Sequence, residues 1–97
     1  MAIAYLYEFA ASDDLTTTNY DAGTQRMGID ADRPDGLLVH CAGFTEDGTF
    51  RMFEVWTSDE LEQRFTAERL MPAIREVAGD TPPPARRERY ELHHVVV

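Results

Sequence analysis

Residues 37–57 read LLVHCAGFTEDGTFRMFEVWT and carry the strongest structural signal in the chain. The runs 37–44 and 49–57 are rich in apolar, β-branched and aromatic residues, which favour strands. The four residues between them end in Asp47 and Gly48, a pair that is typical of hairpin turns. This stretch therefore predicts a β-hairpin.

Upstream of the hairpin, the sequence predicts one strand and one helix. Residues 3–9, IAYLYEF, combine aromatic and β-branched side chains without a breaker, so we expect a strand there. The threonines at 16–18 can cap a helix, and Tyr20 and Met27 recur at helical spacing, so we expect a helix to about residue 28. The turn-rich segment 30–36, DADRPDG, then ends this helix.

Directly after the hairpin, the sequence predicts a second helix. Thr57 and Glu60 form a T-x-x-E capping box, so we expect this helix to be capped by Thr57. Pro72 lacks the N–H that a helix interior needs. We therefore expect a kinked or broken helix that ends near Gly79.

The C-terminal part of the sequence predicts a stiff connector and a last strand. The prolines at 82–84 favour an extended spacer. Residues 86–97 alternate in polarity, so we expect a strand over this whole range. Successive strand residues point to opposite faces, which places His93 and His94 on different sides of the sheet.

The predicted order is strand, helix, strand, strand, helix, strand. This is the ferredoxin-like α+β arrangement, in which a four-stranded antiparallel sheet carries both helices on one face. Ninety-seven residues fit a single domain, 1–97. Tyr5 and Tyr7 alternate with Ala4 and Leu6, so both sheet faces are apolar, and we expect the second face to be covered by another copy of the chain in a homodimer.

Composition excludes several classes of partner. The chain has 18 acidic residues against 9 basic ones and a formal charge of -9, so it would repel nucleic acid and anionic membranes. No apolar run approaches the roughly 20 residues needed to span a bilayer. The N-terminal residues predict a strand instead of a signal peptide. Cys41 is the single cysteine, which suits a reducing cytoplasmic location.

Two short motifs resemble a known superfamily. They are 36–40, GLLVH, and 53–58, FEVWTS, which leads into a helix with Leu61 and Phe65. In these motifs and in element order, the chain resembles the antibiotic biosynthesis monooxygenase-like superfamily of dimeric α+β barrels. That resemblance implies a shared barrel formed by two protomers.

The resemblance leaves several activities open. Members include cofactor-free monooxygenases acting on phenolic polyketides, haem-degrading enzymes, lactone isomerases and polyketide cyclases, and a shared fold does not choose among them. Haem-degrading members carry an aromatic residue and then an iron-ligating histidine on the helix after the third strand. Phe65 matches the aromatic residue, but Arg75 falls at the histidine position, and residues 58–79 contain no histidine. We therefore expect no haem and no other cofactor.

His40 and Glu54 are the candidate catalytic residues. His40 lies within an apolar strand, where an imidazole must be hydrogen-bonded; it is a candidate general base or a core histidine satisfied by a neighbour. Glu54 shares a strand face with Trp56 and is a candidate to orient His40 or to act as an acid of raised pKa. It could equally pair with an arginine as a structural residue.

The candidate substrate-binding residues are mostly aromatic. Their rings could stack on a planar substrate, and tyrosine and tryptophan also offer hydrogen-bond donors; the alternative is that they form the core. His93 or His94 could share the interior with His40. The set is Tyr5, Tyr7, Trp56, Phe65, His93 and His94. No metal-ligand spacing such as HxH or HExxH occurs, so we expect no metal.

Three functions fit these candidates. The first is a cofactor-independent monooxygenase that removes a proton from a small aromatic or polyketide-type molecule through His40. The second is a non-oxidative cyclase or isomerase that uses the same residues. The third is a non-catalytic dimeric protein that binds a small apolar ligand or a partner. The third function predicts an interior filled by side chains, without a pocket near about 300 Å³.

Overall fold

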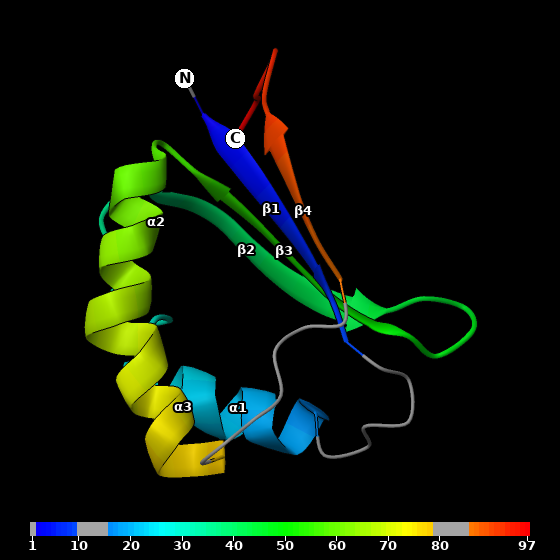
Figure 1. Cartoon of the computed structure of the whole chain (residues 1–97), viewed down its shortest axis with the longest axis vertical. Coiled ribbons are helices and arrows are strands. Elements are labelled where there is room, and N and C mark those ends of the chain that lie inside the picture. Colours follow the sequence, from blue (N-terminus) through cyan, green and yellow to red (C-terminus); the bar gives the residue numbers. More distant parts are fainter. Residues whose placement is uncertain (1, 10–15, 79–85) are drawn as a thin grey trace.

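The computed structural model describes residues 2–9, 16–78 and 86–97. The elements are, in chain order, β1 (Ile3–Glu8), α1 (Thr16–Met27), β2 (Leu37–Phe44), β3 (Phe50–Trp56), α2 (Asp59–Phe65), the π-helical segment η1 (Thr66–Leu70), α3 (Met71–Ala78) and β4 (Arg86–Glu91). The strands form one antiparallel sheet in the order β2-β3-β1-β4. The helices lie together on one side of this sheet (Figure 1). The predicted ferredoxin-like α+β fold is confirmed.

The β2–β3 hairpin forms where the sequence predicts it. Thr45 N–H donates to the Thr49 carbonyl at 2.9 Å, and Gly48 adopts a φ of 87° in the turn between them. A φ in this range favours glycine, since it lacks a Cβ. The register pairs His40 with Glu54 across the two strands. Cross-strand neighbours lie on the same face, so this register brings the two candidate catalytic residues together.

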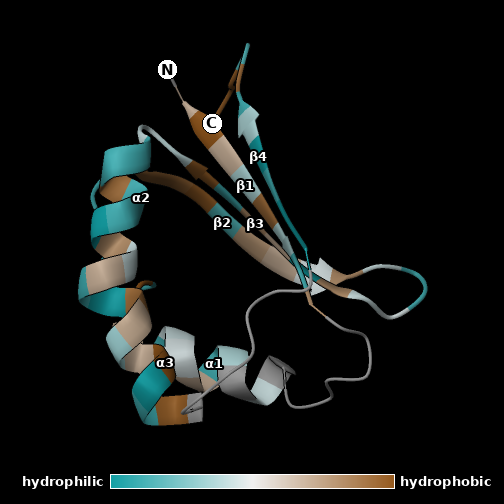
Figure 2. Cartoon of the chain, in the orientation of Figure 1, coloured by the Kyte–Doolittle hydropathy of each residue, from teal (hydrophilic) through white to brown (hydrophobic). Residues whose placement is uncertain are grey.

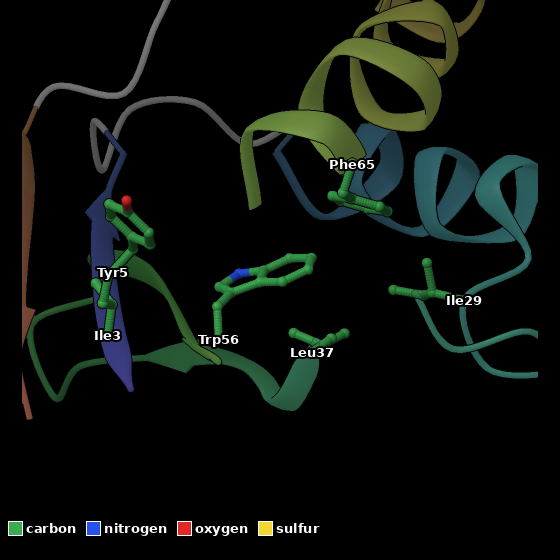
Figure 3. Packing of buried hydrophobic residues seen from close by; sticks show 6 residues of the cluster. All are labelled: Ile3, Tyr5, Ile29, Leu37, Trp56 and Phe65. Atoms are coloured by element: carbon green, nitrogen blue, oxygen red, sulfur yellow. The ribbon is translucent and has the colours of Figure 1, made fainter. Parts of the chain in front are cut away.

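The core lies between the sheet and the helices. Trp56 is 0% exposed and Tyr5 is 2% exposed. Figure 3 shows the Trp56 and Leu37 side chains reaching from the sheet toward Phe65 and Ile29 on the helical side. The Trp56 and Phe65 ring centroids lie 5.3 Å apart. Burial of these aromatic side chains is the main stabilising contribution that attaches the helices to the sheet.

Strand β4, at the edge of the sheet, is hydrophilic over most of its length (Figure 2). The face of the sheet opposite the helices is apolar over part of β1 and β3, beside the charged pair Glu8 and Arg51. Ala4 and Val55 are buried there, and Leu6 and Phe53 are partly buried. Cys41 is exposed. Apolar residues on both faces of the sheet match the sequence pattern.

The start of α2 differs from the prediction. Ser58, not Thr57, is the N-cap, and its Oγ accepts a hydrogen bond from the Leu61 N–H at 3.3 Å. Thr57 is held in the turn before the helix, because its N–H donates to the Gly36 carbonyl at 2.8 Å. The helix therefore begins one residue later than the T-x-x-E motif indicates.

The irregularity expected around Pro72 takes the form of a π-turn. In η1, just before Pro72, the Met71 N–H donates to the carbonyl of Thr66, five residues earlier. A π-turn inserts one extra residue into a helix, and this accommodates the missing N–H of proline. The helical run consequently continues from α2 through η1 into α3 without a break.

Strand β4 is shorter than predicted. It ends at Glu91, although the sequence alternates to the C-terminus. The last ladder contact is the Leu92 N–H donating to the Ala2 carbonyl at 3.0 Å. Because β1 starts at Ile3, a longer β4 would have no strand to pair with. His93 and His94 therefore lie beyond the strand, and both are exposed.

The threonines at 16–18, predicted to cap the first helix, lie within the first turn of α1 instead. Two other predicted features lie outside the described residues, namely the helix end near Gly79 and the connector at 82–84. Within the described part of the chain, no helix combines the length and the apolar character needed to cross a bilayer.

Gly36 offers a direct test of how α2 is placed. Its φ is 88°, and a Cβ there would lie 2.5 Å from Leu61 Cδ1 and 2.9 Å from Thr57 Oγ1. We expect Gly36→Ala to lower the free energy of unfolding by about 2–4 kcal/mol, from backbone strain and overpacking together. Urea unfolding followed by circular dichroism measures this.

Gly48→Ala is the matched control for this substitution. Gly48 has nearly the same φ, 87°, but a Cβ added there would meet no atom within 4 Å. We expect it to cost only the backbone strain, about 1–2 kcal/mol. Equal losses for the two variants would contradict a close approach of α2 to the turn at Gly36.

Candidate active site

His40 and Glu54 form a hydrogen-bonded pair on the helix-facing side of the sheet. The His40 Nδ1 and Glu54 Oε2 atoms lie 2.9 Å apart. The other carboxylate oxygen of Glu54 accepts a hydrogen bond from the Trp56 indole N–H at 3.2 Å. Both oxygens therefore have partners, and no arginine within the described residues forms an ion pair with Glu54. Glu54 is therefore paired with His40 and Trp56, and not with an arginine as the alternative interpretation expected.

Tyr20 completes this network from the helical side. Its hydroxyl lies 2.6 Å from His40 Nε2, and the two rings stack with an interplanar angle of 7°. Burial, followed by the negative charge of Glu54, raises the pKa of the Tyr20 phenol. Tyr20 therefore stays protonated near neutral pH and can donate a hydrogen bond to His40.

These contacts select one tautomer of the neutral imidazole. Glu54 is an acceptor, so Nδ1 carries the proton, and Nε2 accepts from Tyr20. A histidine whose Nδ1–H donates to a carboxylate, and whose Nε2 carries a lone pair, has the arrangement of a general base. A substrate hydroxyl that replaced the Tyr20 hydroxyl at Nε2 could transfer its proton to His40.

His40 borders a cavity of about 210 Å³. The other lining residues come from the segment after α1 and from the start of β2: Ile29, Asp30, Arg33 and Leu37. A second cavity of about 240 Å³ lies against α2 and η1 and includes Phe65 and Arg33 in its lining. Since Arg33 lines both, the two cavities adjoin each other on the β2 side of the molecule.

Tyr5 and Asp59 form a second polar cluster, near the opposite edge of the sheet. The Tyr5 hydroxyl donates to Asp59, and Arg89 contacts both oxygens of the same carboxylate, at 3.2 and 2.6 Å. Hydrogen bonds from Arg89 and then from Tyr5 hold the pKa of Asp59 below its usual range. This cluster joins β1, β4 and the first turn of α2, which is a structural role.

The fold places the chain among known structures. No protein-family model matches the sequence, and no curated protein sequence is significantly similar to it. A predicted antibiotic biosynthesis monooxygenase from Chloroflexus aurantiacus superposes with a TM-score of 0.75 at 12% identity, covering 100% of this chain and 98% of that one. The chain has the antibiotic biosynthesis monooxygenase-like fold.

Two further solved structures share the monooxygenase-like fold. The protein Rv0793 from Mycobacterium tuberculosis has a TM-score of 0.71 at 14% identity, and the match covers 100% of both chains. A variant of SnoaB from Streptomyces nogalater, a cofactor-independent oxygenase, has a TM-score of 0.62 at 10% identity, covering 98% of this chain and 94% of that one. The resemblance seen in the sequence is thus confirmed for the fold.

The predicted binding residues are spread over this monooxygenase-like fold. Trp56 and Phe65 pack against each other in the core, and Tyr5 is buried beside them. Tyr7 is partly buried. Burial, followed by the charges of Glu54 and Glu62, raises the pKa of Tyr7 to about 12. Tyr7 therefore remains a neutral phenol that can donate a hydrogen bond.

The two C-terminal histidines, His93 and His94, do not lie near His40. His93 and His94 follow β4, whereas His40 lies on β2, at the other edge of the sheet. In the described part of the chain, no three His, Cys, Asp or Glu side chains converge in a way that could hold a metal ion. The expectation that no metal takes part stays a prediction.

Two interior residues were not identified from the sequence. The sequence indicates only a helical spacing for Tyr20 and gives no signal for Glu62. Glu62 is 6% exposed and accepts a hydrogen bond from the Thr66 hydroxyl at 2.9 Å. Burial raises the pKa of its carboxyl group, and the Thr66 hydrogen bond opposes that shift. Only the placement of the helices over the sheet reveals these two residues.

Proposed function

We propose that the chain is a cofactor-independent oxygenase-like enzyme acting on a small, activated aromatic molecule of the phenol or anthrone type. His40 is the proposed general base, and Glu54 the residue that positions it. The observation that carries the proposal is the Tyr20–His40–Glu54–Trp56 network beside a cavity. The fold shared with the oxygenase SnoaB supports the same class.

The proposed reaction needs only proton removal and dioxygen. His40 Nε2 takes a proton from the substrate, and Glu54 stabilises the resulting imidazolium. The substrate anion passes one electron to dioxygen, and the two radicals combine to form a carbon–oxygen bond. Protonation gives a hydroperoxide, which loses water and leaves a carbonyl. Overall, a CH₂ group and O₂ become C=O and H₂O.

Oxygen uptake tests this proposal. Purified protein would be mixed with anthrones or dihydroxynaphthalenes, and oxygen consumption would be followed together with product formation. Equimolar oxygen uptake and carbonyl product are expected. Product without oxygen uptake would instead identify a non-oxidative cyclase or isomerase that uses the same base.

A non-catalytic ligand-binding protein is the second candidate. The cavities of about 240 and 210 Å³ are smaller than the roughly 300 Å³ at the low end of usual ligand sites. Tyr5 and Trp56 also fill much of the interior. This candidate predicts saturable binding of an aromatic ligand with neither product nor oxygen uptake.

A homodimer is proposed because part of the second sheet face is apolar. Leu6, Phe53 and Val39 are only partly buried on that face, and Tyr90 is 42% exposed. Packing two such faces would remove them from water around a two-fold axis. The expected result is a dimer in sedimentation at micromolar concentration, and Phe53→Glu should shift it to monomer. A wild-type monomer would contradict the shared barrel.

A further inference from the structure

Arg87 holds an unusual position at the edge of the helix-facing side of the sheet. The register pairs it with Tyr7, so both lie on that face. Its guanidinium carbon lies 4.5 Å from the Tyr5 ring centroid and 5.9 Å from that of Tyr7. Cation–π contacts of this kind orient a guanidinium group while leaving its N–H donors available.

The two other arginines of β4 are already paired with carboxylates. Arg86 pairs with Glu88, and Arg89 pairs with Asp59 at 2.6 Å. Arg87 forms no ion pair with any carboxylate in residues 2–9, 16–78 or 86–97. Yet acidic residues outnumber basic ones two to one in this chain. Within the described part of the chain, Arg87 lies on two tyrosine rings without an ion-pair partner, so its guanidinium group can bind an anion from solution.

The donors of Arg87 and Tyr7 favour a carboxylate over a neutral group, and the negative charge of the nearby Glu62 opposes this preference. The neighbouring Tyr7 phenol keeps its proton, since its pKa is raised to about 12. It can therefore donate a second hydrogen bond next to the guanidinium. Arg87 is exposed, so a ligand can reach it. A planar fork of N–H groups binds both oxygens of a carboxylate, and the tyrosine rings can contact an attached aromatic system.

We propose that Arg87 and Tyr7 form an anion subsite, and that the ligand of this protein is an aromatic carboxylic acid. This inference rests on the proposed function only in taking the ligand to be planar and aromatic. His40 and Arg87 lie on the two edge strands of the same sheet face.

The test compares an acid with its neutral isostere. Binding of 2-naphthoate and 2-naphthamide to the purified protein would be measured by isothermal titration calorimetry. We expect the wild type to bind the acid at least about tenfold more tightly, in line with charge-assisted hydrogen bonds. This preference would act against the net negative charge of the protein, which by itself repels anions.

Two arginine variants test whether Arg87 is the source of the preference for the acid over the amide. Arg87→Gln should bind both compounds equally, whereas Arg86→Gln should keep the wild-type preference, because Arg86 is paired with Glu88. Circular dichroism would verify that both variants are folded. The proposal would be overturned if the wild type bound neither compound, bound both equally, or kept its preference in Arg87→Gln.

Arg33 provides the competing location, since it lines both cavities. Loss of the acid preference in Arg33→Gln, with retention in Arg87→Gln, would place the anion near His40 and overturn the subsite. The anion subsite and the oxygenase activity can be disproved independently of each other. Acid-selective binding without oxygen uptake would sustain the subsite and remove the oxygenase activity.

Discussion

Replacing His40 by glutamine is expected to lower kcat/KM for an accepted phenolic substrate by about 100- to 10,000-fold. Glutamine has similar reach and can still hydrogen-bond to Glu54 and Tyr20, so the network that holds position 40 is largely kept. Its amide cannot accept a proton near neutral pH. The loss should therefore fall on kcat more than on KM. Initial rates of oxygen uptake and of product formation measure this.

His94→Gln is the control for this variant. It makes the same change of side chain at an exposed position beyond β4, and we expect wild-type rates. Thermal unfolding of both variants, followed by circular dichroism, would show whether a loss of activity comes from the missing base or from unfolding of the protein. If His40→Gln kept turnover within about threefold of the wild type on every accepted substrate, His40 would not be the base.

The largest expected effect on stability comes from Trp56→Ala, at about 3–5 kcal/mol of unfolding free energy. Trp56 is fully buried and packs on Phe65 between sheet and helix. Its removal would leave a cavity and would also take away the N–H donor to Glu54. The total stability of a small domain is about 5–15 kcal/mol, so much of it would be lost.

Chemical unfolding by urea measures this change. It should be followed by circular dichroism, because Trp56 is the single tryptophan of the chain and its fluorescence disappears in the variant. Trp56→Phe keeps most of the buried ring but not the donor, and should cost less, about 1–3 kcal/mol. Phe44→Ala, at a position 61% exposed, should change stability by about 0.5 kcal/mol or less. Similar values for Trp56→Ala and Phe44→Ala would contradict a core built around Trp56.

Some features of the fold could be predicted from the sequence, and others could not. The hairpin at β2 and β3 was predictable, because strand propensity and an Asp-Gly turn act over neighbouring residues. The length of β4 was not, since a strand continues only while a partner strand lies beside it. The cap of α2 was placed one residue early for a similar reason, as Gly36 holds Thr57 from a distant part of the chain.

The candidate site shows the same division. Alternation placed Glu54 and Trp56 on one strand face, and the register of two adjacent strands then brought His40 to Glu54. The contact of Tyr20 with His40 depends on where α1 lies over the sheet. No spacing along the chain encodes that position. The burial of Glu62 depends on the same helix packing.

By itself, the sequence determined the ferredoxin-like order of elements, the two apolar sheet faces and the acidic charge of the protein. These properties follow from the period of side chains along a strand or helix and from a simple count of charges. Only the tertiary structure decided which polar groups meet: Tyr20 with His40, Asp59 with Arg89, and Arg87 with two tyrosine rings. Such contacts join residues far apart in the chain, and their partners are set by packing and strand register, which local sequence does not specify.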